Sequence, residues 1–378
     1  MVCFEEKKGG TRRLDGVAVI EVFADLIASQ EGNDLTKSVP LAENRHLAFQ
    51  GFKFGGPFEI GGDLARSMLC APLNPNGKGN SAVIRRWFNG MDLTRRVSER
   101  WCIDFGVELS EFDATLFELP YETAKFQWVA ENARLVAAGK PPLRPGEAAT
   151  LATWWIHQRP RPEMRTGLAG LHRFVATPEV AKHRVFVWLD GGMVASGSVY
   201  SIARDDDTTF GILHSRFHEF WALRMGTFLG VGNDPRYTPS TTFETFPFPE
   251  RLTPNTPAAD YAADPRAQKI AAAAARLNEL RENWLNPSDL VVRVPEVVPG
   301  YPDRILPKNA EAEAQLKKRT LTNLYNARPA WLDHAHKALD EAVAEAYGWG
   351  DDWRAGKLTD DEILARLFRL NQERAALQ

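Results

Sequence analysis

The sequence predicts an α+β protein in which a mixed region precedes a small all-helical region. Between about residues 40 and 250, short apolar runs alternate with clusters of Gly, Pro and Asn, which is typical of strands joined by long connections. After the Pro-rich segment 247–257, apolar residues recur at helical spacing. The regular strand–helix alternation of a doubly wound nucleotide-binding fold is not seen. We therefore expect three parts: residues 1–39, 40–250 and 251–378.

The composition is that of an ordinary globular protein. Of 378 residues, 44% are hydrophobic and 25% charged, which suffices for a sizeable core and excludes global disorder. The formal net charge is only −3, so a polyanionic partner has to be held by a local basic surface. Cys3, Cys70 and Cys102 lie far apart, which excludes a disulfide framework and a Cys-x-x-Cys site and suits a reducing cytoplasm. No apolar run is long enough to span a membrane, and the N-terminus has no signal-peptide pattern.

The first part predicts a small hairpin. Residues 2–4 and 17–27 are expected to form two strands, with the charged segment 7–13 as the turn between them. A lone hairpin of this size is marginal in water. We therefore expect it to be the end of a larger sheet that belongs to another domain.

The middle part predicts a mixture of strands and helices. A helix is expected over residues 215–225 and another over 121–138, where Ala124, Trp128 and Leu135 share one face. Asp205, Asp206 and Asp207 are interpreted as a solvated hairpin turn rather than an ion site. The expected strands are 101–105, 172–175, 185–189, 194–202 and 210–213.

The last part predicts four helices. Asp264 caps the first, which starts at Pro265 and stops at Asn286. A Pro-rich excursion over 295–307 leads to the second helix. The others are a third that stops at Gly348 and a fourth opened by a capping box from Thr359 to Glu362. Leu316, Leu321 and Leu324 mark the second, and Leu332, Ala335, Leu339, Val343 and Ala346 the third.

No motif predicts catalysis or metal binding. The glycines of segment 51–56 match neither phosphate-binding pattern and predict a turn, and no Gly-x-Ser-x-Gly occurs. His214 and His218 have ligand spacing on a helix, but Ser215 stands where a zinc protease needs Glu. His334 and His336 face different sides of a helix.

Basic residues interleaved with aromatic ones are the positive signal. Residues 154–184 contain six Lys or Arg against two acidic residues, and residues 78–100 contain the same excess. Trp87, Trp154, Trp155 and Trp188 lie within or beside these clusters. Such a pattern suits either an ordinary solvated surface or the neutralisation of phosphates and the recognition of guanine edges.

Five segments together resemble the specificity half of the MmeI-like fused restriction–modification enzymes, which are single-chain adenine methyltransferases that often carry an endonuclease. They are residues 101–106, 182–189, 211–223, 237–249 and 319–331, and the resemblance runs from about residue 14 to 375. It implies a DNA target-recognition domain at 40–250 and a C-terminal helical domain at 251–378. Residues 1–39 would be the remnant of the methyltransferase sheet and a connector.

The sequence departs from that family in its catalytic motifs. It has neither a Gly-rich turn for S-adenosylmethionine nor an Asn/Asp-Pro-Pro-Tyr/Phe loop for the flipped adenine. Its one Pro-Pro pair, Pro141-Pro142, follows Gly139-Lys140. We therefore expect no cofactor and no activity in this chain alone, with S-adenosylmethionine bound by a methyltransferase domain or subunit in trans.

The candidate site residues are all polar side chains suited to double-stranded DNA. In the resembled family the loop before the Tyr-Thr/Ser segment carries base-reading side chains, which implies that role for Asn233, Asp234 and Arg236. From their predicted positions on strands, Lys182, His183, Arg184, Tyr200 and Ser201 are further base-reading candidates. Phosphate candidates are Arg161, Arg165, Arg173, Ser215 and Arg216. Core packing is expected for Phe217, Trp221, Phe243, Phe246 and Phe248.

Three functional hypotheses remain open from the sequence. The first is a DNA-reading module that works with a methyltransferase. The second is a metal-dependent hydrolase with a site at His214, His218 and Asp205–Asp207. The third is a remnant without activity.

Overall fold

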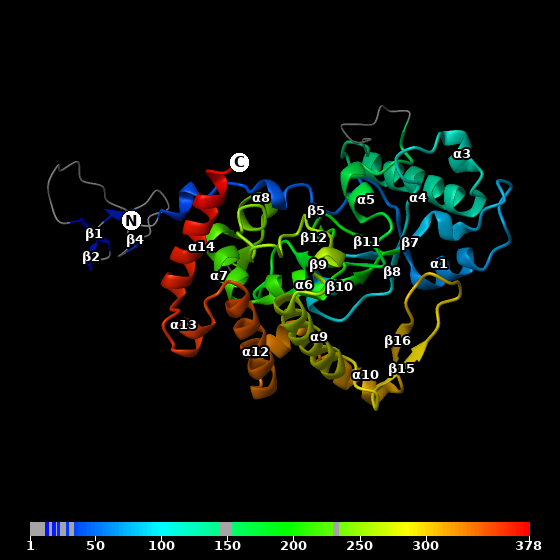
Figure 1. Cartoon of the computed structure of the whole chain (residues 1–378). Helices are drawn as coiled ribbons and strands as arrows, with labels where there is room; N and C mark the ends of the chain where they lie inside the picture. Colours follow the sequence, from blue (N-terminus) through cyan, green and yellow to red (C-terminus); the bar gives the residue numbers. More distant parts are fainter. Residues whose placement is uncertain are drawn as a thin grey trace.

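The computed structural model describes residues 12–14, 17–19, 21–22, 28–29, 34–143, 153–229 and 234–378. In Figure 1 the two four-stranded sheets lie in the middle, with α1, α3 and α4 at the right, α12 and α14 toward the left and the long helix α9 below the sheets. The predicted α+β class, with helices prevailing in the C-terminal region, is confirmed.

Two four-stranded sheets form the centre of the described structure. One has the order β10-β9-β12-β5 with antiparallel neighbours, and the other has the order β11-β7-β8-β6, in which only β11 and β7 are parallel. The strands are β5 (Ala48–Gln50), β6 (Glu59–Gly61), β7 (Ile84–Phe88), β8 (Arg100–Ile103), β9 (Arg173–Pro178), β10 (Val187–Asp190), β11 (Val194–Ala195) and β12 (Val199–Ile202).

The sheets meet where residue 51 passes the turn between β11 and β12. A Cβ on Gly51 would lie 2.1 Å from the carbonyl oxygen of Ser196, so only glycine fits this crossing. At the same point the predicted strand 194–202 is broken, because Val199 N–H bonds back to Ser196 O and makes a turn. The predicted strands at 101–105, 172–175 and 185–189 correspond to β8, β9 and β10.

Short helices and one long helix cover the second sheet. The long helix α4 (Glu118–Ala137) confirms the predicted helix, and its Tyr121 and Ala124 pack with Trp101 and Ile103 of β8. The other helices of this part are α1 (Gly62–Leu69), α2 (Gly90–Thr94), α3 (Glu111–Thr115) and α5 (Pro162–Leu168), with a 3-10 turn η3 (Asn80–Ala82).

The predicted strand 210–213 is wrong, since these residues lie in helix α6 (Asp207–His214). Asp206 caps the helix by accepting a 2.7 Å hydrogen bond from Thr209 N–H, so the acidic run is a helix start and not a hairpin turn. Every residue from Thr208 to His214 is buried, which removes the polar face that marks a helix in a sequence. The next helix, α7 (Arg216–Met225), is as predicted.

The C-terminal helices follow the predicted caps. Helix α9 (Pro265–Leu285) is capped by Asp264, and α14 (Asp360–Ala375) is capped by Thr359. The predicted second helix is two helices, and α13 was not predicted. The remaining elements are α8 (Pro239–Thr242), η4 (Ala258–Tyr261), α10 (Ala310–Leu316), α11 (Leu321–Ala327), α12 (Ala330–Ala346) and α13 (Gly350–Arg354).

The tail is not purely helical as predicted. Strands β15 (Val291–Val294) and β16 (Arg304–Pro307) form an antiparallel hairpin around the Pro-rich excursion. Its loop reaches the second sheet, where the Tyr301 hydroxyl donates a 2.6 Å hydrogen bond to Ile84 O and the ring packs edge-on against Trp101. Proline prevents helix continuation here, and the extended chain pairs with itself instead.

The N-terminal part differs from the predicted hairpin. Strand β1 (Arg12–Leu14) pairs with β2 (Val17–Val19), and β3 (Glu21–Val22) pairs with β4 (Ala28–Ser29). Arg12 and Arg13 therefore lie in a strand and not in the predicted turn. The predicted strand at 2–4 lies outside the described residues. Two 3-10 turns follow, η1 (Leu35–Lys37) and η2 (Ala42–Asn44).

One hydrophobic core crosses the predicted boundary at residue 250. Phe217 and Trp221 of α7 and the linker residues Phe243, Phe246 and Phe248 are fully buried, which confirms their predicted packing role. They belong to the same cluster as Ile270 of α9, Leu339 of α12 and Leu367 of α14. The Pro-rich linker is therefore part of the core.

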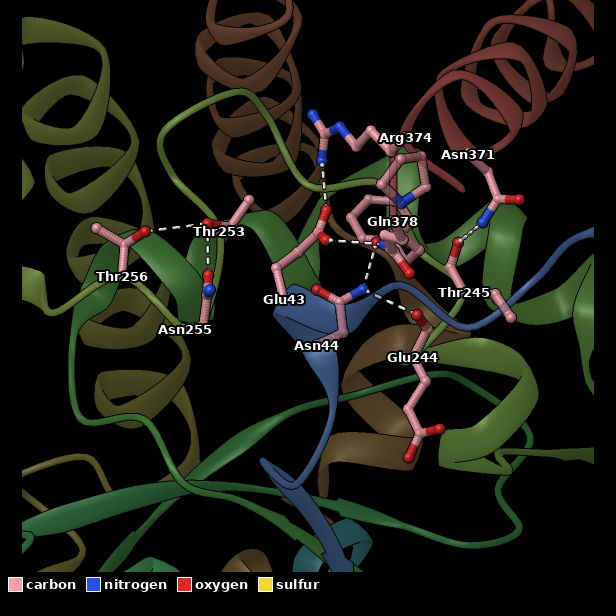
Figure 2. A network of polar contacts seen from close by, with 12 residues as sticks. Glu43, Asn44, Glu244, Thr245, Thr253, Asn255, Thr256, Asn371, Arg374 and Gln378 are labelled. Carbon is pink, nitrogen blue, oxygen red and sulfur yellow. Dashed lines mark hydrogen bonds and ion pairs between the residues drawn. The ribbon is translucent and has the colours of Figure 1, made fainter. Parts of the chain in front are cut away.

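Amide side chains bind residues 39–44 to the linker and to the last helix, α14 (Figure 2). The buried Asn44 Nδ2 donates to Phe243 O, Glu244 O and Phe246 O at 3.1, 3.1 and 2.7 Å. Asn371 Nδ2 of α14 donates to Thr245 O at 2.7 Å and to Val39 O at 2.8 Å. We call this arrangement the amide clamp; it fixes residues 39–44 against the C-terminal helix.

Candidate nucleic-acid interface

Residues of the first sheet build a polar surface around Tyr200. Gln50 of β5 lies opposite Tyr200 of β12 in the strand register. Its side chain donates to Gly197 O at 2.7 Å and accepts a 2.6 Å hydrogen bond from Arg161 Nη2. Arg161 has a left-handed backbone, with φ of 54°, at the start of α5, which is uncommon outside glycine. Gln50 thus orients the guanidinium of Arg161, a residue whose backbone conformation is unusual.

A second guanidinium is placed by a short hairpin. Strands β13 (Thr227–Leu229) and β14 (Asp234–Arg236) pair with each other, and β14 runs along residues 179–181. Arg236 contacts the Glu179 carboxylate through Nε at 2.9 Å and Nη2 at 2.8 Å. The hairpin base is therefore fixed to the sheet by an ion pair and by backbone hydrogen bonds.

Two exposed basic residues continue the surface. Lys53 and Arg159 exchange backbone hydrogen bonds at 3.2 and 3.1 Å in an antiparallel bridge, so their side chains start from neighbouring points. Both are exposed. We call Lys53, Arg159, Arg161 and Arg236 the basic surface; it carries four positive charges against the one negative charge of Glu179. Such a local excess can hold phosphates although the whole chain is slightly acidic.

Lys182 and His183 directly follow residues 179–181, along which β14 runs, and contact helix α11. Lys182 Nζ is 2.6 Å and His183 Nε2 is 2.9 Å from Asn326 Oδ1 of α11. The structure therefore brings the predicted strand entry, the hairpin and the helical region together.

Several base-reading candidates are buried. Arg184 donates to Pro178 O, Thr177 Oγ1 and Pro235 O, and burial lowers its pKa to about 10. Ser201 is fully buried, and burial followed by the charge of Glu179 raises the pKa of Tyr200. In this conformation Arg184, Tyr200 and Ser201 pack beneath the polar surface and are not exposed to a ligand. Asn233 lies outside the described residues.

Most phosphate candidates are engaged within the protein. Arg165 makes two 2.8 Å hydrogen bonds to the buried Asp104. Burial alone would raise the pKa of Asp104, but the charges of His157 and Arg165 hold it at about 2. Arg173 lies 3.8 Å over the Trp188 ring, the Ser215 hydroxyl is buried on Ile212 O, and Arg216 pairs with Asp360. Among the phosphate candidates, Arg161 alone joins the basic surface.

The residues of the hydrolase hypothesis do not converge. His214 Nε2 accepts from Phe186 N–H and Arg281, and His218 bonds Leu213 O and the Tyr237 hydroxyl. Both rings are buried, and burial lowers both pKa values, that of His218 to about 3. Within the described ranges, three or more His, Cys, Asp or Glu side chains gather nowhere at metal-binding distance. In the same ranges no helix is long and apolar enough to cross a bilayer.

The sequence did not point to Gln50, Lys53, Arg159 and Glu179 as a group. Arg159 and Glu179 lie in the stretch 154–184, but the group is assembled by the pairing of Gln50 with Tyr200, 150 residues apart, and of Lys53 with Arg159, 106 residues apart. These residues can be recognised as one group only when the pairing of β5 with β12 is known.

The fold has a counterpart among solved structures. It is similar to that of the Type IIL restriction-modification enzyme MmeI, solved in complex with DNA, with 17% sequence identity and a TM-score of 0.58. The similarity covers 96% of this chain and 40% of the MmeI chain, so this chain spans less than half of that enzyme's length. No protein-family model and no curated protein matches the sequence.

Proposed function

We propose that this chain recognises specific sequences in double-stranded DNA as the specificity part of an adenine-specific methyltransferase or restriction–modification system. The observation that carries the proposal is the basic surface beside the β13–β14 hairpin, on a fold shared with an enzyme solved on DNA. Residues 40–250 would be the target-recognition part and residues 251–378 its helical support.

The hairpin has the shape required to read bases. The major groove admits a two-stranded ribbon. Phe228 and Leu229 of β13 are each 51% exposed, so the hairpin projects apolar side chains that suit thymine methyl groups. Asp234 and Arg236 of β14 supply an acceptor for cytosine amines and a fork for guanine edges. Asn233 is a further proposed reader, suited to adenine.

The basic surface would hold the phosphates on either side of the groove. Lys53 and Arg159 are exposed, and Arg161 is oriented by Gln50. Phosphate contacts position a protein on the duplex without reading sequence, and base contacts then specify. In support of this arrangement, Arg161 and Arg236 both lie near Tyr200, where their charges act on its hydroxyl.

The methyl group would be transferred by a separate methyltransferase unit that binds S-adenosylmethionine. Its docking place in this proposal is the N-terminal strands and α14, and the amide clamp fixes residues 39–44, which follow those strands in the chain, to α14 (Figure 2). The clamp would transmit the position of that unit to the DNA-reading sheet.

The test is the salt dependence of duplex binding, measured by fluorescence anisotropy. We expect the logarithm of the affinity to fall with log salt at a slope of about −0.9 per neutralised phosphate. The double variant Lys53→Glu, Arg159→Glu should bind more weakly with a shallower slope. Arg276→Glu, on an exposed face of α9, is the matched control and should behave as wild type. Equal slopes for all three proteins would contradict the proposed phosphate surface.

A further inference from the structure

A cavity of about 390 Å³ lies where β7 of the second sheet and β10 of the first sheet meet the C-terminal helices. Its walls come from β7 and α2, from β10, from the end of α9, from the β15–β16 hairpin and from Leu321 of α11. Phe88, Leu93, Leu189, Met193 and Ile305 give it apolar sides. A volume of this size is within the range of small-molecule sites.

One wall of the cavity carries a buried cation without a polar partner. Arg86 lies on the same face of β7 as Phe88 and is only 7% exposed. It forms no hydrogen bond or ion pair with any residue in the described part of the chain, and its Nε is fully buried without an acceptor. Its neighbours are the rings of Phe88 and Trp101, each 5.7 Å from the guanidinium carbon. A buried guanidinium without an acceptor is costly, so this position calls for an anion.

The nearby carboxylates are taken by other arginines. Arg66 lies 2.7 Å from Glu99 and 3.8 Å from the fully buried Glu296, and Arg304 lies 3.9 Å from Glu296. Asp63, which also contacts Arg66, is fully exposed to water. The guanidiniums of Arg66, Arg86 and Arg304 therefore share the carboxylates of the exposed Glu99 and the buried Glu296, and Arg86 is the one that forms no ion pair with either.

Three other acidic residues of the walls, Asp92, Asp190 and Glu282, form hydrogen bonds within the protein. Asp92 accepts hydrogen bonds from Asn89 N–H, Ser98 N–H and the Ser98 hydroxyl. Asp190 accepts from Gly192 N–H, and Glu282 accepts from Asn286 Nδ2. The exposed charged residues of the lining are Arg95, Glu99, Arg293 and Asp303.

A second donor on the wall lacks an acceptor. The Trp188 indole Nε1 is buried and has no hydrogen-bond partner. The Trp188 ring is stacked on Phe210 at 4.7 Å and carries Arg173 at 3.8 Å, so its orientation is fixed. Arg86 from β7 and Trp188 from β10 both line the cavity.

We propose that this cavity is a binding site for a small molecule that carries an oxyanion, a carboxylate or a phosphate, on an apolar or aromatic body. The oxyanion pairs with Arg86, and the body lies against Phe88, Leu93 and Met193. Because the walls come from both the sheet and the helical region, the ligand stabilises the contact between them. The site is separate from the basic surface and does not depend on DNA recognition.

The test is isothermal titration of the full chain with phenyl phosphate, sodium benzoate and the neutral benzyl alcohol. We expect one-to-one binding of the two anions and at least tenfold weaker binding of benzyl alcohol. Arg86→Met removes the guanidinium but keeps an unbranched side chain as far as the position of Nε, and it should weaken phenyl phosphate binding at least tenfold. Arg276→Met removes an exposed arginine of α9 and should leave the affinity unchanged.

The wild-type anion series keeps the test decisive if Arg86→Met does not fold. Absence of phenyl phosphate binding, or equal binding of phenyl phosphate and benzyl alcohol, would overturn the proposal. Equal affinity in wild type and Arg86→Met would do the same. A mixed-sequence duplex should not displace phenyl phosphate; displacement would show that the anion partner of Arg86 is a DNA phosphate and would contradict a small-molecule site.

Discussion

Arg236 shows how a residue predicted to read bases can also hold the structure. Its guanidinium is paired with Glu179 on one edge, and the side chain is 39% exposed. The pair fixes the direction of the fork, which lowers the entropy lost when a base is bound. Burial gives Arg184 the opposite role, because its Nη1 and Nη2 donate to two backbone carbonyls and to Thr177.

Exchanging the charges of the hairpin should change which base is preferred. In Asp234→Arg with Arg236→Asp, the donor and acceptor positions are reversed. We expect the preference at one position of the site to change, with discrimination of about 1–3 kcal/mol, while binding to mixed duplexes stays similar. The measurement is competition binding with duplexes that differ at single positions. Uniform weakening on every duplex would argue against base reading by these residues.

Buried histidines make the stability dependent on pH. Burial lowers the pKa of His218 to about 3, against about 6.5 in the unfolded chain. The unfolded state therefore binds the extra proton below pH 6.5, and the free energy of unfolding falls as the pH decreases from 6.5 toward 3. For this group alone the loss approaches about 1.4 kcal/mol per pH unit.

His218→Gln should flatten that dependence. Asp340 acts in the opposite direction, because burial raises its pKa to about 7, but it is common to both proteins and cancels in the comparison. Urea denaturation at pH 6.5 and 5.5 measures the difference. An identical fall in wild type and variant would show that His218 does not titrate as its burial requires.

At the scale of elements, the amide clamp joins three segments that are far apart in the chain. One side chain, Asn44, donates to three backbone carbonyls, of which Glu244 O also accepts from Leu41 N–H and Phe243 O from Phe246 N–H. Asn371 does the same for two more. Few hydrophobic contacts could specify this junction as narrowly, because amide geometry fixes both distance and direction.

Removing one amide of the clamp should destabilise the protein measurably. We expect Asn44→Ala to lower the free energy of unfolding by about 2 kcal/mol, since the buried amide loses its hydrogen bonds and Phe246 O loses its donor. Asn323→Ala is the control; that amide is exposed, and its loss should cost less than about 0.5 kcal/mol. Equal effects of the two changes in urea denaturation would contradict a structural role of the clamp.

Helices with clear caps could be predicted from the sequence, and buried ones could not. Asp264 and Thr359 mark α9 and α14 correctly because capping is local chemistry. Helix α6 was mistaken for a strand because its residues are buried on all sides and show no period. Its Gly211 lies against α9, where a Cβ would be 2.7 Å from Ile270, and nothing in the local sequence shows that contact.

At the scale of the whole molecule, the core extends across the predicted domain boundary. Leu35, Trp221, Leu277 and Leu367 belong to one cluster, so the sheet and the helices are supported together. The sequence predicts the order of these parts and the α+β class. The basic surface could be predicted only in part, because Lys53, Arg161 and Arg236 meet through strand pairing and side-chain contacts over long separations.

The most direct test of sequence-specific reading is to incubate the purified chain with a random duplex library and sequence the bound fraction. The account predicts enrichment of one defined motif, which the Asp234→Arg, Arg236→Asp exchange alters at a single position and the Arg276→Glu control leaves unchanged. A bound fraction with the base composition of the input library would contradict it.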